Sequence, residues 1–210
     1  MKLTVFGATG GIGTEVVRQA LRSGHSVTAV VRDPARLPVE DGALEKVVAD
    51  VFDAEEIAAY VKGADAVVSA LGPREGGPAT VVRDGAAAVR WAMRETGVRR
   101  IVLVSAAGQK TAPGDDPLTR YVAKPIVQRV FRDGFADLAA METVIRGSGL
   151  DWTLVRPPRL VDKPGRGRYR RGVDRNVPFG FSIARADVAT EILRAVPDPL
   201  TFGHEVWIAY

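Results

Sequence analysis

The sequence has 210 residues, enough for one domain with a substantial buried core, and its 46% apolar and 26% charged residues are ordinary for a globular protein. A net charge of +4 is too small to indicate nucleic-acid binding unless it is concentrated, and the lack of cysteine excludes disulfides, zinc–thiolate sites and thiol catalysis. No apolar run is long enough to cross a bilayer, and the chain starts directly with a strand-like segment. We therefore expect a cytoplasmic protein without a membrane partner.

A strand at residues 3–6, a glycine-rich turn and a helix open the chain. From Ile12 onwards the apolar residues recur at helical spacing. Gly7 permits a tight turn, Gly10 leaves room for a pyrophosphate, and Gly13 lets the helix pack closely on the strand. The free N–H groups at the helix N-terminus then face a ligand. The stretch predicts a dinucleotide site; the alternative is a simple strand-to-helix turn.

The second predicted strand, Ser26–Val31, ends in two charged residues that bear on cofactor choice. At this position an acidic residue binds the ribose 2′-hydroxyl, whereas an arginine accommodates a 2′-phosphate. Arg32 holds this position and Arg36 follows one helical turn later, which favours NADPH over NADH. The alternatives are that both arginines are only solvated, or that Asp33 serves a ribose hydroxyl.

Further strands and helices alternate along the chain. We expect strands at 47–49, 66–70, 101–104, 151–155 and 205–209, the last at a sheet edge. We expect helices from Asp53 to Val61, at 80–96, in a long region beyond Lys124 that ends near 147, and at 183–196. This alternation predicts a single α/β domain over 1–210, with a doubly wound, mostly parallel sheet covered by helices on both faces. Ligands then bind beyond the carboxyl ends of the strands.

Two loops and several polar residues complete the pattern. We expect residues 109–117 to form a loop, with a mobile flap over the site as one interpretation, and residues 163–175 to form a basic loop that is solvated or gates the substrate. Asp187 is expected on the exposed side of the last helix or in its cap. The basic loop has one aromatic residue, Tyr169, so we do not expect nucleic acid. The two histidines lack ligand spacing, and we expect no metal.

Five stretches together resemble the atypical short-chain dehydrogenase/reductases. They are Gly7–Gly13, Val31–Asp33, Asp50–Val51, Ser69–Gly72 and Ser148–Pro157. The chain is most similar to the NAD(P)H-binding group that includes biliverdin IXβ/flavin reductase and the NmrA-like regulators. The resemblance implies a Rossmann fold with a small C-terminal substrate-side extension from about residue 157. It also implies bound NADP(H), with NAD(H) as the weaker alternative.

The resemblance also implies roles for individual residues. The implied cofactor contacts are Gly7, Thr9, Gly10, Gly11, Ile12 and Gly13 around the pyrophosphate, Arg32 and Arg36 at the 2′-phosphate, Asp50 and Val51 near the adenine, Leu71 and Gly72 along the ribose and diphosphate, and Ser105 and Pro157 beside the nicotinamide. Pro158 and Arg159 would border the substrate, and Glu142 matches an acidic position common in this branch.

Catalysis is harder to predict. Ordinary members use a serine with a tyrosine and a lysine four residues apart, and the lysine lowers the pKa of the tyrosine. Here Ser105 can supply the serine, but Tyr121 and Lys124 are three apart and Pro125 follows. Reduction of a flavin, quinone or similar conjugated acceptor by hydride from NADPH does not need this pair. We expect such a reductase, a monomer or homodimer acting on a small-molecule acceptor; the alternative is an NmrA-like NADP(H) sensor without turnover.

Overall fold

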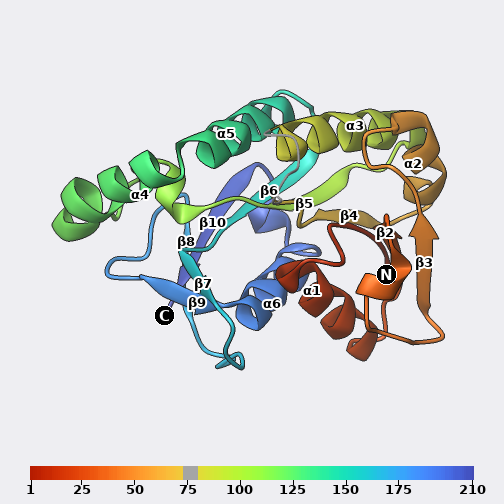
Figure 1. Cartoon of the computed structure of the whole chain (residues 1–210), viewed down its shortest axis with the longest axis horizontal. Coiled ribbons are helices and arrows are strands. Elements are labelled where there is room, and N and C mark those ends of the chain that lie inside the picture. The colour runs from red at the N-terminus through yellow and green to blue at the C-terminus, as the bar shows by residue number, and fades with distance from the viewer. Residues whose placement is uncertain (73–79) are drawn as a thin grey trace.

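A computed structural model describes residues 1–72 and 80–210. In this part of the chain eight strands form one sheet in the order β3-β2-β1-β4-β5-β6-β10-β8 (Figure 1). The strands are β1 (Lys2–Phe6), β2 (Ser26–Val31), β3 (Leu44–Val48), β4 (Ala66–Ser69), β5 (Arg100–Val104), β6 (Asp151–Arg156), β8 (Arg170–Val173) and β10 (His204–Ala209). All pairs are parallel except β10 with β8. The strand order reverses between β1 and β4, which confirms the predicted doubly wound fold.

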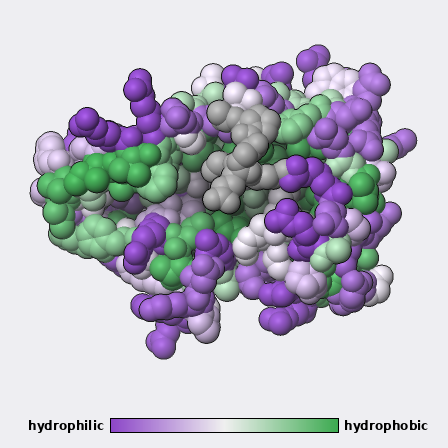
Figure 2. Space-filling view, in the orientation of Figure 1, coloured by the Kyte–Doolittle hydropathy of each residue, from purple (hydrophilic) through white to green (hydrophobic). Residues whose placement is uncertain are grey.

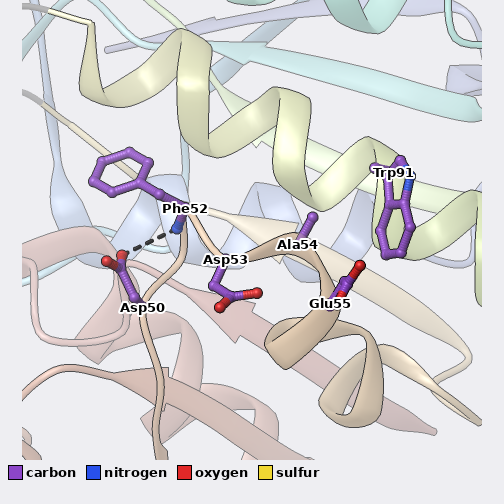
Figure 3. Close-up of a pocket in the computed structure, with 6 residues that line it drawn as sticks. All are labelled: Asp50, Phe52, Asp53, Ala54, Glu55 and Trp91. Atoms are coloured by element: carbon purple, nitrogen blue, oxygen red, sulfur yellow. Dashed lines mark hydrogen bonds between the residues drawn. The ribbon is translucent and has the colours of Figure 1, made fainter.

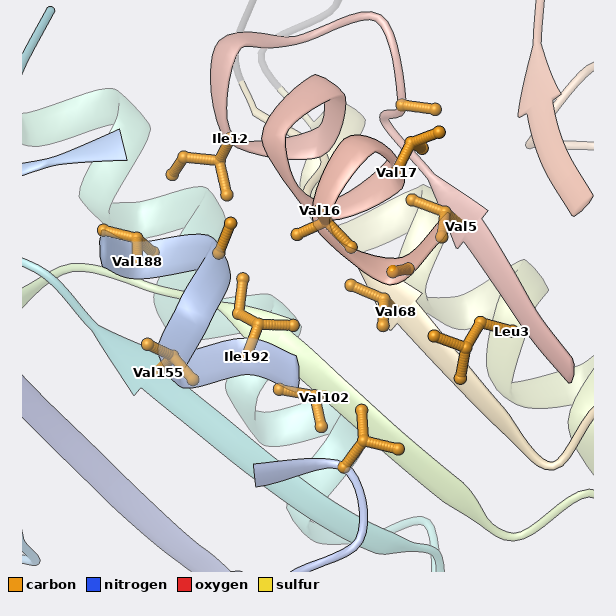
Figure 4. Close-up of a cluster of buried hydrophobic side chains, with 14 of the residues drawn as sticks. Leu3, Val5, Ile12, Val16, Val17, Val68, Val102, Val155, Val188 and Ile192 are labelled. Atoms are coloured by element: carbon orange, nitrogen blue, oxygen red, sulfur yellow. The ribbon is translucent and has the colours of Figure 1, made fainter. Parts of the chain in front are cut away.

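Helices cover both faces of the sheet. The helix α1 (Gly11–Arg22) and the helix α6 (Arg185–Ala195) pack side by side on one face, where their valines and isoleucines meet those of the strands (Figure 4). The other face carries α2 (Ala54–Val61), α3 (Val81–Thr96) and α5 (Arg132–Arg146). Within β1, Val5 belongs to the first layer and Phe6 to the second, and both are fully buried. A strand covered on both faces is apolar throughout for this reason.

The C-terminal part differs from the sequence-based expectation in three ways. The basic segment is not entirely a loop, because residues 170–173 form β8. The strand β10 lies between β6 and β8, so it is not at the edge. The helix α6 starts two residues later than expected, because residues 182–184 are part of a short strand, β9 (Ser182–Ala184), that pairs with β7 (Arg159–Val161).

Asp187 is also buried, contrary to the expectation that it would be exposed or act only as a cap. Its carboxylate accepts hydrogen bonds from the N–H groups of Arg166 and Gly167, at 2.8 and 2.9 Å, and from the Tyr210 hydroxyl. A buried carboxylate needs such partners, since desolvation is otherwise costly. The start of the basic segment is therefore anchored to α6.

The 109–117 segment is held by two aspartates. Asp115 accepts hydrogen bonds from the Lys124 ammonium, at 2.6 and 2.8 Å, and from Asn176 Nδ2. Asp116 accepts from Thr119 and from the N–H of Phe179. Burial opposes ionisation of Asp116, but these hydrogen bonds prevail and lower its pKa to about 2. Both carboxylates thus tie the segment to residues 176–179.

The helix α4 (Lys124–Val130) extends to one side of the molecule and is preceded by a π-helical turn, Thr119–Ala123 (Figure 1). Pro125 has no N–H for the helical ladder, which accounts for a wider turn just before it. Apolar side chains are exposed along this region, and Figure 2 shows the apolar surface there. They are Leu118, Val122, Ile126 and Val130, spaced four residues apart, with Tyr121 and Phe131 beside them.

Candidate functional site

The glycines after β1 have distinct structural roles. Gly7 has φ +75°, and a Cβ there would lie 2.5 Å from the carbonyl oxygen of Ala70. A Cβ on Gly13 would lie 2.1 Å from the carbonyl oxygen of Gly7, so α1 approaches the turn more closely than any other residue would permit. Gly10 is exposed, and a Cβ there would meet only Gly7 O, at 3.3 Å. Gly7 and Gly13 are thus required by the turn itself, while Gly10 faces open space.

The start of α1 has the form that holds a diphosphate. Gly10 is its N-cap, has no side chain to accept a hydrogen bond, and is followed by a first turn without acidic residues. Among the described residues, the N–H groups of Gly11, Ile12 and Gly13 have no hydrogen-bond acceptor. Thr14 closes the turn instead, through its hydroxyl to the Ala8 carbonyl at 2.9 Å. Unpaired amides at a positive helix end are what an anion needs.

The register of the sheet gathers the other predicted cofactor residues at the same edge. Phe6 pairs with Val30 on one side and Ser69 on the other, and Val31 pairs with Val48. The residues that follow these strands therefore lie at neighbouring carboxyl ends: Gly7, Arg32, Asp50, Leu71 and Gly72. Thr9 lies within the glycine turn itself and is partly exposed.

Arg32 and Arg36 are both exposed just beyond β2. No ion pair joins either guanidinium to another described residue. Asp33 instead caps the short helical turn Pro34–Arg36, because its Oδ1 accepts a hydrogen bond from the N–H of Ala35. Arg32 and Arg36 are therefore available to a phosphate, whereas Asp33 stabilises the chain.

The segment after β3 forms a hollow of about 550 Å³ beside the predicted adenine contacts (Figure 3). Asp50 lines this hollow together with Phe52, and Asp50 Oδ1 accepts a hydrogen bond from the Phe52 N–H at 3.0 Å. Trp91 of α3 lines its other end. Val51 is buried and packs towards Gly85 on the inner side.

Ser105 is buried beyond the end of β5 and belongs to a polar cluster. Its hydroxyl donates to Glu142 Oε1 at 2.6 Å and accepts from Arg156 Nη1 at 3.3 Å. Arg156 is fully buried and also binds Glu142 Oε2, at 2.6 Å, and Glu205 Oε2, at 2.5 Å. The serine proton is therefore directed at a carboxylate of the protein.

Glu205 connects this cluster to two further cations, Lys110 and Arg146. Burial opposes its ionisation, but Arg156 and the hydrogen bonds from all three cations lower the pKa of Glu205 to about 2. A hollow of about 440 Å³ adjoins the cluster between α4 and α5, and is lined by Lys110, Glu142 and Arg146 among others. Sequence reasoning missed Arg156 and Glu205 as partners, although an arginine at the end of an apolar strand signals a buried ion pair.

Tyr121 and Lys124 lie in different surroundings. Tyr121 is 73% exposed, and the Arg120 guanidinium lies 5.9 Å from its ring centre. The Lys124 side chain is 3% exposed and its ammonium is held by Asp115. Burial lowers the pKa of Lys124 from its ordinary value, although Asp115 opposes this shift. Tyr121 is thus exposed and Lys124 buried, and no hydrogen bond joins the two side chains in the described part of the chain.

The residues after β6 continue the same sheet edge. Pro157 is buried, and its carbonyl accepts a hydrogen bond from the Ala107 N–H at 2.9 Å, which fixes it close to Ser105. Pro158 is partly exposed, and Arg159 is exposed at the start of β7. In the described residues, no cluster of three potential metal ligands is present. None of the helices described has both the length and the apolar character that a membrane crossing needs.

Comparison with known proteins identifies the family. Residues 7–199 match the family model described as NAD(P)H-binding. A Bacillus subtilis protein described as an uncharacterized sugar epimerase, YhfK, is 30% identical, covering 96% of this chain and 90% of that protein. The 3-diazoavenalumate denitrifying reductase of a Streptomyces species is 32% identical, covering 82% of this chain and 60% of that protein.

A crystal structure of a Burkholderia pseudomallei protein has a TM-score of 0.83 and 29% identity, and each chain is covered completely. The family match includes the glycine turn, the arginines after β2 and three residues of the polar cluster, Ser105, Glu142 and Arg156. It agrees with the predicted resemblance to atypical short-chain dehydrogenase/reductases and NmrA-like proteins. The start of α1 is open and lies where the strand order of the doubly wound sheet reverses, and the family model matches nearly the whole chain. This protein therefore belongs to the NAD(P)H-binding family, and its cofactor is NAD(P)H.

Proposed function

We propose that this protein is an NADPH-dependent oxidoreductase that reduces a flavin, quinone or similar conjugated small molecule by hydride transfer. The observation that carries the proposal is the pair of exposed arginines, Arg32 and Arg36, beyond β2, at the same sheet edge as the open start of α1. A guanidinium binds a phosphate through two parallel hydrogen bonds and so favours the 2′-phosphorylated dinucleotide.

The choice of acceptor rests on the missing proton relay. NADPH, when bound, supplies hydride from its nicotinamide ring. In this structure the Ser105 hydroxyl donates to Glu142, and Lys124 is occupied by Asp115. A carbonyl substrate would need a proton from such groups, whereas a conjugated ring accepts hydride without a tyrosine–lysine pair. The two named relatives carry names for different reactions, so the choice of acceptor rests on these side chains alone.

The test is oxidation of NADPH, followed at its nicotinamide absorbance, with FMN, riboflavin and a soluble quinone as acceptors. We expect turnover with NADPH, less with NADH, and a large loss of NADPH turnover in Arg32→Glu, because a carboxylate repels the 2′-phosphate. NADH working as well as NADPH in both proteins would contradict the role of Arg32.

The alternative is an NADP(H) sensor without turnover, in the manner of the NmrA-like regulators. The same observation favours it, since the Ser105 hydroxyl donates to Glu142 and the Lys124 ammonium is paired with Asp115. Calorimetric binding of NADP⁺ combined with no oxidation of NADPH across flavins, quinones and carbonyls would decide for the sensor.

A further inference from the structure

Arg185, the first residue of α6, reaches the start of α1, although nothing in its local sequence marks it as a cofactor residue. The pairing of β7 with β9 explains its position. Val161 is opposite Ala184, so the next residues, Asp162 and Arg185, emerge side by side. Arg185 Nη1 forms an ion pair with Asp162 Oδ1.

The stem of Arg185 crosses the exposed first residue of α1. A Cβ on Gly11 would lie 2.5 Å from Arg185 Cδ and 2.7 Å from its Nε. Only glycine at position 11 therefore lets this arginine lie flat against the helix end whose amides are unpaired. The contact places a cationic side chain from the C-terminal part of the chain beside the glycine turn.

The charges around this point favour an anion. The start of α1 has no acidic residue in its first turn and no side-chain cap. Arg185 is at the positive end of its own helix, where a cation is disfavoured. The nearby Asp187 does not compensate, because its oxygens accept hydrogen bonds from the chain at 166–167 and from Tyr210. Asp162 is thus the carboxylate that balances Arg185.

The ion pair between Asp162 and Arg185 is weak. The side chain of Asp162 is 86% exposed and that of Arg185 is 30% exposed. Exposed ion pairs contribute little and exchange readily. We propose that Arg185 is a further ligand of the cofactor diphosphate: its guanidinium would leave Asp162 and bind diphosphate oxygens beside the amides of α1. This inference rests on the placement of the diphosphate at Gly10–Gly13 in the proposed function.

The experiment compares two ligands by calorimetry at one low salt concentration. NADP⁺ contains the diphosphate, whereas adenosine 2′-monophosphate contains only the part that Arg32 would recognise. We expect Arg185→Ala to weaken NADP⁺ binding about tenfold or more, as for the loss of one charge-assisted hydrogen bond, and to leave binding of adenosine 2′-monophosphate unchanged. Asp162→Asn frees Arg185 and is expected to tighten NADP⁺ binding.

The matched control is Arg22→Ala, which removes the same charge from the exposed far end of α1. We expect it to leave both affinities unchanged. Equal losses of NADP⁺ affinity in Arg185→Ala and Arg22→Ala would reduce the effect to net charge and overturn the proposal. So would equal losses for both ligands in Arg185→Ala, or no loss. Wild-type protein that binds no dinucleotide would instead refute the proposed function itself.

Discussion

Two glycine substitutions in the turn after β1 separate folding from cofactor binding. In Gly13→Ala the new Cβ lies 2.1 Å from Gly7 O, where ordinary contacts are 3.4–4 Å. Gly7 O belongs to the backbone, and the backbone of residue 13 fixes the position of Cβ, so no side-chain rotation relieves the clash. We expect α1 to shift outwards at a cost of about 3 kcal/mol, the upper part of the range for overpacking. For a chain of this size the corresponding fall in Tm is about 10 °C.

In Gly10→Ala the same methyl group has a different effect. Gly10 has φ −80° and ψ 162°, which alanine adopts freely, and the new Cβ meets only Gly7 O at 3.3 Å. We expect the stability to change by less than about 1 kcal/mol. The methyl group projects into the space above the free amides, however, and we expect the affinity for NADP⁺ to fall about tenfold or more.

The assay is thermal or urea unfolding of each variant, together with calorimetric titration of NADP⁺ into the folded protein. The control is Gly134→Ala in α5, where a Cβ meets nothing within 4 Å. It is expected to stabilise the protein by up to about 1 kcal/mol and to leave binding unchanged. Wild-type affinity in Gly10→Ala would show that the diphosphate does not approach this residue, and wild-type stability in Gly13→Ala would refute the close packing of α1.

Three further perturbations test the buried polar groups. Asp115→Asn leaves the Lys124 ammonium buried without its charged partner and is expected to cost about 3 kcal/mol in urea unfolding; unchanged stability would refute the pairing. The pKa of Glu205 is 4.5 in the unfolded chain and about 2 in the folded protein. Its ionised carboxylate therefore contributes about 3 kcal/mol to the free energy of unfolding above pH 4.5, and this contribution is lost as the pH falls towards 2. Glu205→Gln should flatten this part of the pH–stability curve, and a curve as steep as that of the wild type would exclude Glu205 as its source. Trp207 is fully buried and its Nε1 has no hydrogen-bond partner among the described residues, so Trp207→Phe loses no hydrogen bond. Its cost in urea unfolding should stay below the roughly 3–5 kcal/mol usual for truncating a buried tryptophan to alanine.

The sequence predicted those parts of the site that depend on local chain geometry. The glycine turn could be predicted because a strand, three glycines and a helix are consecutive, and their spacing alone limits the backbone to a few conformations. Arg32 could be placed for a similar reason: it directly follows an apolar strand whose end is visible in the sequence. The alternation of strands and helices predicted a doubly wound, mostly parallel sheet with helices on both faces.

Contacts between distant segments were beyond the reach of the sequence. Ser105, Glu142 and Arg156 are 14 to 51 residues apart in the chain and meet only because β5, β6 and α5 pack together. Similarly, Tyr121 and Lys124 are close in the chain, but the burial of Asp115 beside Lys124 decides that the lysine is occupied.

The sequence by itself determined the strand, glycine turn and helix that open a doubly wound sheet, and it predicted that this turn binds a diphosphate, because hydrophobic periodicity and glycine spacing are local properties of the chain. Only the tertiary structure decided which charges neutralise one another and which remain free for a ligand. The cost of burying a charge depends on the partner that packing brings within reach, and that partner, as for Glu205 beside the buried Arg156, comes from a distant part of the chain.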